Sequence, residues 1–96
     1  DGERAYVIRN GCKEMSRITG TGCQLSGLIT AFLVANPDKA LEAVAAATCT
    51  MGLAGEIGKA HLQEGEGNAG YRNRIIDAIS LMTGEELEKG AKYEIR

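Results

Sequence analysis

A glycine-rich stretch that contains a cysteine, RITGTGCQLSG at residues 17–27, carries the clearest chemistry of this 96-residue chain. Gly20 and Gly22 lack a Cβ, so the backbone N–H groups beside them can approach a ligand closely. Thr21 is followed three residues later by a glutamine, which is the pattern of a capping box and predicts a helix with Thr21 as its N-cap. The free amides and the positive dipole end of a first helical turn favour an anion, or a negative charge that develops during a reaction.

Cys23 lies in the first turn of that predicted helix. A free thiol has a pKa of about 8.5, and a helix N-terminus favours the thiolate form. Cys23 is therefore a candidate base or nucleophile. The alternative is the commonest role of a cysteine, a small buried hydrophobic residue. Arg17, just before the glycines, could meet a phosphate or could be a solvated strand residue.

A second glycine-rich segment, Gly65-x-Gly67-x-x-Gly70, matches the letters of the dinucleotide-binding fingerprint. That fingerprint follows a strand, whereas the residues before this segment predict a helix. We therefore interpret the segment as a connection between two helices, with Asn68 as a possible helix cap.

The remaining cysteines and the histidine carry no motif. Cys12 in a predicted turn and Cys49 in a helix interior are interpreted as structural, and His61 as a solvated residue at a helix C-terminus. Three cysteines without a C-x-x-C pair, accompanied by one histidine, support neither a zinc site nor a disulfide framework. We therefore assign no metal ligand to this chain.

Composition narrows the classes of partner. The chain has 11 basic and 13 acidic residues, a net charge of −2, one Phe, three Tyr and no Trp. It has neither a basic stripe nor many aromatic rings for stacking, which argues against nucleic acid. Gly27, Thr30 and the break at Asn36-Pro37-Asp38 interrupt the best apolar stretch, so no membrane span is predicted. We expect a cytoplasmic protein.

Two strands are predicted near the N-terminus. Residues 5–11, AYVIRNG, combine Tyr, Val and Ile and end in Asn-Gly, which is typical of a strand followed by a turn. Residues 14–19, EMSRIT, predict a second strand, so the two should form a β-hairpin. Residues 91–96, AKYEIR, are a further strand or a frayed tail.

Three main helices are predicted between these strands. The Asn36-Pro37-Asp38 break separates the first two, because proline suits the first turn of a helix and not its interior. The third is followed by a short EELEKG turn whose charges suit the helix dipole. We expect the first helix to run from Thr21 to this break, and the second from about Lys39 to about Gln63. On the third helix, Ile75, Ile79 and Met82 form an apolar stripe.

Glycines recur at intervals of three in the second helix, at Gly52, Gly55 and Gly58. Each costs about 1 kcal/mol of helix stability relative to alanine. Close packing against a neighbour would compensate for this cost, and the alternative is a break in the helix between Gly52 and Gly58. The helices are apolar on more than one face, and one hairpin, marginal by itself in water, cannot cover them. Either the chain oligomerises or the rest of its sheet lies elsewhere.

At Thr19-Gly20-Thr21-Gly22-Cys23 the chain resembles the hydroxyethylthiazole kinases of thiamine salvage, a branch of the ribokinase-like superfamily. The resemblance extends, in order and spacing, to DGER at 1–4, IRNG at 8–11, MSRITGTGCQLSGLITAFL at 15–33 and GLAGEIGKA at 52–60. It implies the C-terminal part of an α/β, ribokinase-like fold, with a β-hairpin followed by three main helices that pack on a mostly absent parallel sheet. Residues 1–96 would then be an incomplete C-terminal segment of a single kinase domain.

The resemblance also implies an activity, transfer of the γ-phosphate of ATP, with Mg²⁺, to the primary alcohol of 4-methyl-5-(2-hydroxyethyl)thiazole. It implies that Gly20 touches the thiazole, that Cys23 is the catalytic base, and that the anion hole is formed by Gly20, Thr21, Gly22 and Cys23. It further implies a homotrimer with thiazole sites between subunits, in which the missing N-terminal part of the kinase supplies the acidic residues around magnesium. On its own, the segment is expected to be inactive.

Two positions depart from the family pattern. Cys12-Lys13 stands where the family commonly has His-Pro, and Gly65–Tyr71 stands where it commonly has Gly-x-Gly-Ser/Thr-Phe. Neither departure touches the predicted anion hole. Two other functions remain open from the residues: a cysteine-nucleophile enzyme that uses Cys23 with His61 as its base, and a non-catalytic anion-binding or assembly segment.

Overall fold

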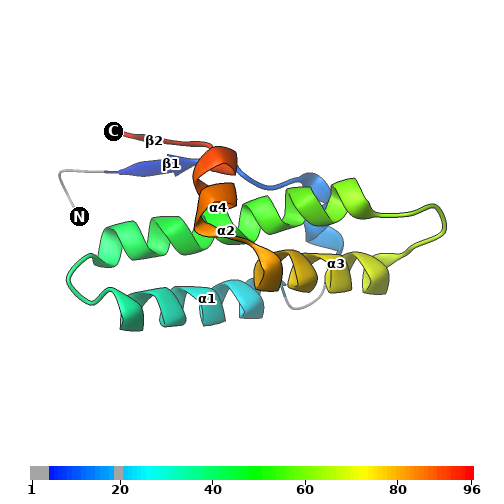
Figure 1. Cartoon of the computed structure of the whole chain (residues 1–96), viewed down its shortest axis with the longest axis horizontal. Helices are drawn as coiled ribbons and strands as arrows, with labels where there is room; N and C mark the ends of the chain where they lie inside the picture. The colour runs from blue at the N-terminus through cyan, green and yellow to red at the C-terminus, as the bar shows by residue number, and fades with distance from the viewer. Residues whose placement is uncertain (1–4, 19–20) are drawn as a thin grey trace.

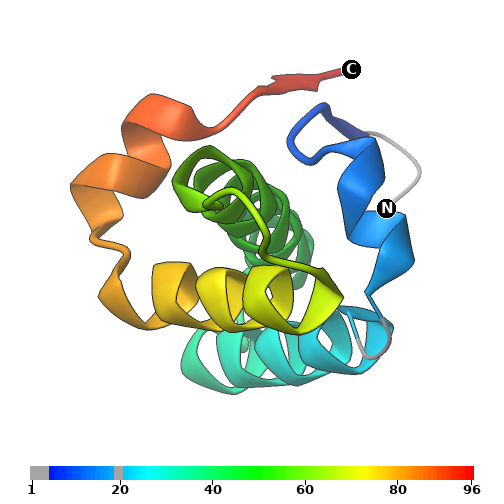
Figure 2. The ribbon, with the colours of Figure 1, turned by 90° about the vertical axis from the view of Figure 1, so that its right-hand side faces the viewer.

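Helix α2 lies at the centre of the molecule, and the other elements surround it (Figure 1 and Figure 2). The computed structural model describes residues 5–18 and 21–96. α1 and α3 pack along one side of α2, and the pair β1–β2 lies on the opposite side (Figure 1). In chain order the elements are β1 (Tyr6–Ile8), a 3₁₀ helix (Lys13–Arg17), α1 (Thr21–Ala35), α2 (Ala40–His61), α3 (Asn68–Leu81), α4 (Gly84–Gly90) and β2 (Tyr93–Ile95).

The predicted break between the first two helices is confirmed. α1 ends at Ala35 and α2 begins at Ala40, so Asn36-Pro37-Asp38 lies in the connection. The Phe32 carbonyl in the last turn of α1 accepts hydrogen bonds from the backbone N–H and from the side-chain amide of Asn36, each at 3.0 Å. α1 and α2 consequently run back along each other.

α2 continues without a break through its three glycines, so close packing is the correct alternative. A Cβ on Gly52 would lie 2.7 Å from the carbonyl carbon of Asn10, and a Cβ on Gly55 would overlap the Met15 side chain. A Cβ on Gly58 would lie 3.2 Å from the backbone nitrogen of Ile75 in α3. The glycines therefore allow the segment before α1, and the helix after α2, to approach the α2 backbone.

The core forms between α2, α3 and the segment that precedes α1. Ile75 of α3 is fully buried and Ile76 beside it is 42% exposed, which matches the one-sided stripe predicted for this helix. Half-buried apolar side chains of α1, Leu25 and Leu28, pack against the same cluster. The buried members of the cluster are Ile18, Met51, Ala54, Tyr71, Ile75 and Ala78.

The predicted β-hairpin is wrong. Residues 13–17 form a 3₁₀ helix, and β1 pairs instead with β2 from the other end of the chain, antiparallel, with Tyr6 opposite Ile95. The hydrophobic alternation in residues 14–19 is imperfect, and the 3₁₀ turn packs the Met15 side chain against Gly55 of α2. The C-terminal strand, left open as a strand or a frayed tail, is confirmed as a strand.

Two boundaries near α3 also differ from the prediction. α3 begins at Asn68, inside the segment interpreted as a connection, and Gly67 is its N-cap residue. Asn68 is therefore the first helical residue and not a cap. The EELEKG turn is a complete short helix, α4, which begins with a capping box between Thr83 and Glu86.

α2 is long and apolar enough to cross a membrane by length and composition. No membrane span was predicted from the sequence, because only the apolar stretch before residue 36 was considered. Of the most apolar 18-residue window of α2, 56% is buried inside the structure. Core packing therefore accounts for the apolar character of α2. In the described part of the chain, which is mostly helical, the only sheet is the β1–β2 pair. This arrangement is compatible with a segment of a larger α/β kinase fold.

Candidate active site

The first turn of α1 presents the cysteine that the sequence singled out. α1 begins at Thr21, and Cys23 is a free, exposed cysteine in its first turn, so it is not part of the core of this chain. Gly22 is exposed, and a Cβ there would meet nothing within 4 Å. Open space therefore lies beside Gly22, and free amides in such a first turn are what an anion site requires.

Part of the predicted anion hole lies outside the described residues, namely Gly20 together with the side chain of Thr21. The helix begins one residue earlier than predicted, because Thr21 is already helical. The Oε1 atom of Gln24 is buried and accepts no hydrogen bond within the described part of the chain, whereas the Thr21 half of the expected capping box lies outside the described residues.

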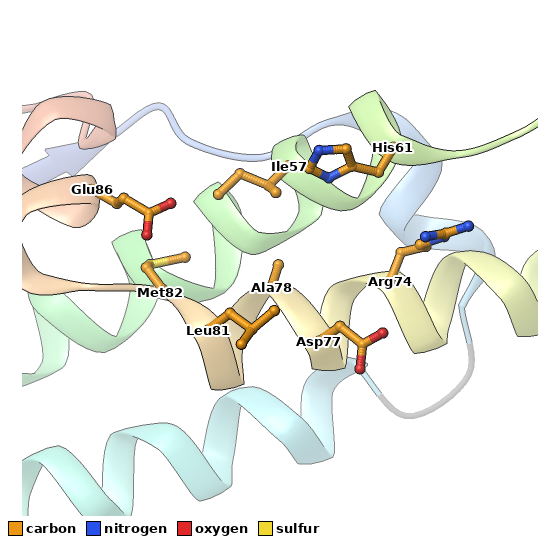
Figure 3. Close-up of a pocket in the computed structure, with 8 residues that line it drawn as sticks. All are labelled: Ile57, His61, Arg74, Asp77, Ala78, Leu81, Met82 and Glu86. Carbon is orange, nitrogen blue, oxygen red and sulfur yellow. The ribbon is translucent and has the colours of Figure 1, made fainter.

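His61 does not join Cys23 in one site. It lines a hollow of about 380 Å³ between α2, α3 and α4, together with Arg74 and Asp77, and Cys23 is absent from that lining (Figure 3). His61 is exposed near the C-terminus of α2, as predicted from the sequence. No group of three or more His, Cys, Asp or Glu side chains that could hold a metal ion occurs in residues 5–18 and 21–96.

A polar cluster that the sequence analysis missed fixes the chain shortly before α1. Glu56 of α2 accepts hydrogen bonds from the backbone N–H of Gly11 at 2.8 Å, from Asn10 Nδ2 at 2.9 Å and from Lys92 Nζ at 2.8 Å. Asn10 also donates to the Gly90 carbonyl at 2.9 Å and accepts from the Lys92 N–H at 2.6 Å. We call Glu56, Asn10, Gly11 and Lys92 the Glu56 clamp.

Gly11 has a φ of +120°, a conformation that side-chain-bearing residues rarely adopt, so the turn at the clamp favours glycine. Burial would raise the pKa of Glu56, but the hydrogen bonds from Lys92, Gly11 and Asn10 outweigh burial and hold that pKa below its ordinary value. The clamp joins IRNG and GLAGEIGKA, two of the segments that carry the family resemblance. That shared resemblance was the available signal that they meet.

A buried tyrosine holds the next residue of the same segment. Tyr71 of α3 is 3% exposed, its hydroxyl donates to the Gly55 carbonyl at 2.9 Å, and the hydroxyl oxygen lies 3.0 Å from Cys12 Sγ. Burial, together with the hydrogen bond to Cys12, raises the pKa of Tyr71. Cys12 therefore has a structural contact, as interpreted from the sequence. Cys49 is buried in α2, and burial raises the pKa of its thiol.

Acid should weaken the Glu56 clamp. A carboxylate whose pKa is lowered by folding stabilises the folded state fully above its unfolded pKa, and this contribution is lost as the pH falls through the folded pKa. For Glu56 the loss should begin near its ordinary pKa of 4.5 and continue below it. Urea unfolding at a series of pH values should therefore give a falling free energy of unfolding below about pH 4.5.

The Glu56→Gln variant isolates the contribution of this residue to the pH dependence. Its stability should be lower at neutral pH but should fall less steeply in acid, because the amide does not titrate. Glu14 and Glu66 also have lowered pKa values, through hydrogen bonds from Lys59 and from the Gln63 N–H respectively, and they titrate in both proteins. Parallel pH curves for the two proteins would contradict a lowered pKa at Glu56.

Comparison with known proteins identifies the family. The model of the hydroxyethylthiazole kinase family matches residues 1–85. A hydroxyethylthiazole kinase of Clostridium acetobutylicum is 47% identical over 91 residues, which cover 95% of this chain and 33% of that protein. The hydroxyethylthiazole kinase of Arabidopsis thaliana is 42% identical over 82% of this chain and 28% of its own length. That of Zea mays is 34% identical over 100% of this chain and 33% of its own length. The chain thus spans about a third of the length of these curated relatives, and it belongs to the hydroxyethylthiazole kinase family.

Proposed function

We propose that this chain is the C-terminal segment of a single-domain, ribokinase-like kinase that phosphorylates the primary alcohol of 4-methyl-5-(2-hydroxyethyl)thiazole with ATP. Family membership over residues 1–85 supports the reaction class. The observation that carries the proposal is the exposed Cys23 in the first turn of α1, beside a glycine with open space around it. These are the residues that a phosphoryl-transfer site at this turn would need.

The first turn of α1 supplies the anion hole in this proposal. The backbone N–H groups of Gly20, Thr21, Gly22 and Cys23 face the oxygens of the transferred phosphoryl group, and Gly20 touches the thiazole ring. Free amides at a helix N-terminus stabilise such negative charge without any rearrangement during the reaction.

Cys23 accepts the proton of the alcohol. The alcohol oxygen attacks the γ-phosphorus, the bond from that phosphorus to the bridging oxygen of ATP breaks, ADP leaves, and the hydroxyl proton passes to the Cys23 thiolate. Phosphoryl transfer depends chiefly on positioning and charge stabilisation, so a modest base suffices.

Mg²⁺ would neutralise charge on the phosphates. The described residues hold no group of three or more His, Cys, Asp or Glu side chains for it, so its ligands are placed in the preceding part of the kinase.

The proposed enzyme is a cytoplasmic homotrimer of longer chains. The chain covers about a third of its relatives, so the parallel sheet, the magnesium ligands and part of the nucleotide pocket come from the N-terminal part. Exposed apolar side chains such as Val34 at 77% and Leu81 at 76% are consistent with further protein covering these helices. By itself the 96-residue chain is inactive.

An assay of product formation tests the proposal. A full-length kinase that contains this segment is incubated with ATP, Mg²⁺ and the thiazole alcohol, and phosphorylated alcohol is measured by mass spectrometry. We expect turnover by the full-length protein and none by the 96-residue chain. Phosphate binding without turnover in the full-length trimer would instead favour the non-catalytic anion-binding alternative. Covalent labelling of Cys23 by substrate would favour the cysteine nucleophile, although His61 lines a hollow to which Cys23 does not contribute.

A further inference from the structure

We propose that Glu56 is a positioning residue for the first turn of α1, acting through Asn10, Gly11 and the segment of residues 12–18. The inference rests on the proposed function only in that this turn binds the transferring phosphoryl group. Glu56 lies in the C-terminal part of α2 and touches neither Cys23 nor Gly22 in any contact of the described residues. Its effect would therefore pass through residues 10–18 and the core that they share with α1.

The clamp fixes the beginning of that segment. Three donors converge on one carboxylate: the Gly11 N–H and Asn10 Nδ2 on Oε2, and Lys92 Nζ on Oε1. The Glu56 side chain is 23% exposed, so water can replace these partners only in part. Gly52, one turn earlier in α2, lets the Asn10 backbone approach closely enough for this geometry.

Two further anchors hold the segment between the clamp and α1. The Met15 side chain lies over Gly55, where any Cβ would overlap it. Ile18 is 6% exposed in the core cluster, and Leu25 and Leu28 of α1 pack against the same cluster. A shift of Gly11 would therefore reach α1 through residues 12–18 and the core cluster on which Ile18 and α1 both pack.

A carboxylate is needed at position 56 for a specific chemical reason. Glu56→Ala leaves the Gly11 N–H and the Asn10 amide without their acceptor. Glu56→Gln keeps one acceptor oxygen for those two donors and turns its NH₂ group toward Lys92, which is exposed and can turn to water. The glutamine variant should therefore rescue most of what the alanine variant loses.

Hydrogen exchange tests the positioning without reference to catalysis. Amides of residues 25–28 are suitable reporters, because in an α-helix they bond to the carbonyls of residues 21–24. In full-length Glu56→Ala we expect exchange of residues 11–18 and 25–28 to accelerate by about tenfold or more, while the core of α2 and α3 keeps its protection. Uniform acceleration throughout α2 and α3 would overturn the inference, since Glu56 would then only stabilise the whole fold.

Kinetics on the same proteins test the catalytic consequence. Small displacements of a positioned group can cost about 100-fold in rate, so we expect kcat of Glu56→Ala to fall by about 10- to 100-fold, with KM for ATP changed much less. Glu56→Gln should recover to within about threefold of wild type. Glu85→Gln removes an equally charged but exposed carboxylate of α4 and should change neither readout.

The outcomes separate the inference from the proposed function. Local loosening of residues 25–28 with unchanged kcat would overturn the positioning role while leaving the kinase assignment intact. Absence of turnover in the unsubstituted full-length protein would overturn the proposed function, and the exchange data would still decide whether Glu56 positions this turn. If Glu56→Ala does not fold, Glu56→Asp, whose carboxylate is one methylene shorter and cannot reach the Gly11 N–H and Asn10 Nδ2 in the same way, replaces it in both measurements. Exchange of residues 25–28 and kcat identical to wild type in that variant would overturn the inference.

Discussion

Replacing Gly52 with alanine is expected to lower the free energy of unfolding by about 2–3 kcal/mol, although alanine is the better helix former by about 1 kcal/mol. The added Cβ would lie 2.7 Å from the carbonyl carbon, the carbonyl oxygen and the Cβ of Asn10. Because the obstacle is largely backbone, it cannot turn aside as the end of a flexible side chain could. Overpacking of this kind typically costs about 1–3 kcal/mol.

The substitution would also pull Asn10 away from its partners. Asn10 donates to Glu56 and to the Gly90 carbonyl, and each part-buried donor left without an acceptor costs about 1–3 kcal/mol. These costs together exceed the gain in helix propensity, which fixes the sign of the effect. Chemical denaturation followed by far-ultraviolet circular dichroism would measure it.

Gly27→Ala is the matched control. Gly27 lies inside α1 and is exposed, and an added Cβ would meet nothing within 4 Å. There the helix propensity acts alone, so stability should rise by up to about 1 kcal/mol. If both substitutions raised stability equally, Asn10 could not lie against α2 as described.

The helices were predictable because their signals are local. Proline and its neighbours at residues 36–38 end one helix and begin the next through backbone geometry that needs no distant partner. The spacing of Gly52, Gly55 and Gly58 likewise predicted close packing. It did not identify Asn10 and Met15 as the neighbours, because a glycine indicates only that another group packs closely against the helix and not which group this is.

The strand pairing was not predictable in the same way. Residues 5–11 were correctly expected to contain a strand, but its partner is separated by almost the whole chain, with Val7 opposite Glu94. A two-stranded pair gains its stability from the surface that it packs on, here α2. Local propensity therefore could not decide between residues 14–19 and the C-terminal strand.

The candidate site likewise contains one part that local sequence could predict and one part that it could not. The position of Cys23 in the first turn of α1 was predicted from residues that are adjacent in sequence. In the Glu56 clamp, Glu56 is separated in the sequence by 45 positions from Gly11 and by 46 positions from Asn10. Nothing in the local pattern of GLAGEIGKA indicates that its glutamate faces IRNG. Only their common membership in the resemblance to one family linked the two segments.

In the full-length kinase, Cys23→Ala is expected to lower kcat by about 100-fold, the lower end of the range for loss of a general base. The anion hole is built from backbone N–H groups, which the substitution leaves in place, so substantial turnover above the uncatalysed reaction should remain. Cys23 is exposed and an alanine fits a helix well, so stability should not fall. Steady-state kinetics with ATP and the thiazole alcohol would measure the effect.

Cys23→Asp distinguishes a base from a contact. A carboxylate at this position can accept the hydroxyl proton, so the aspartate variant should retain activity that the alanine variant loses. Ser26→Ala, at an exposed position of α1 nearly one turn beyond Cys23, should leave kcat unchanged. Equal and severe loss in Cys23→Ala and Cys23→Asp would refute the base assignment, because a role that only a thiol can fill is then packing or nucleophilic attack. A nucleophile would leave a covalent adduct on Cys23, whereas a packing role would leave none, so mass spectrometry of the protein during turnover separates these two explanations.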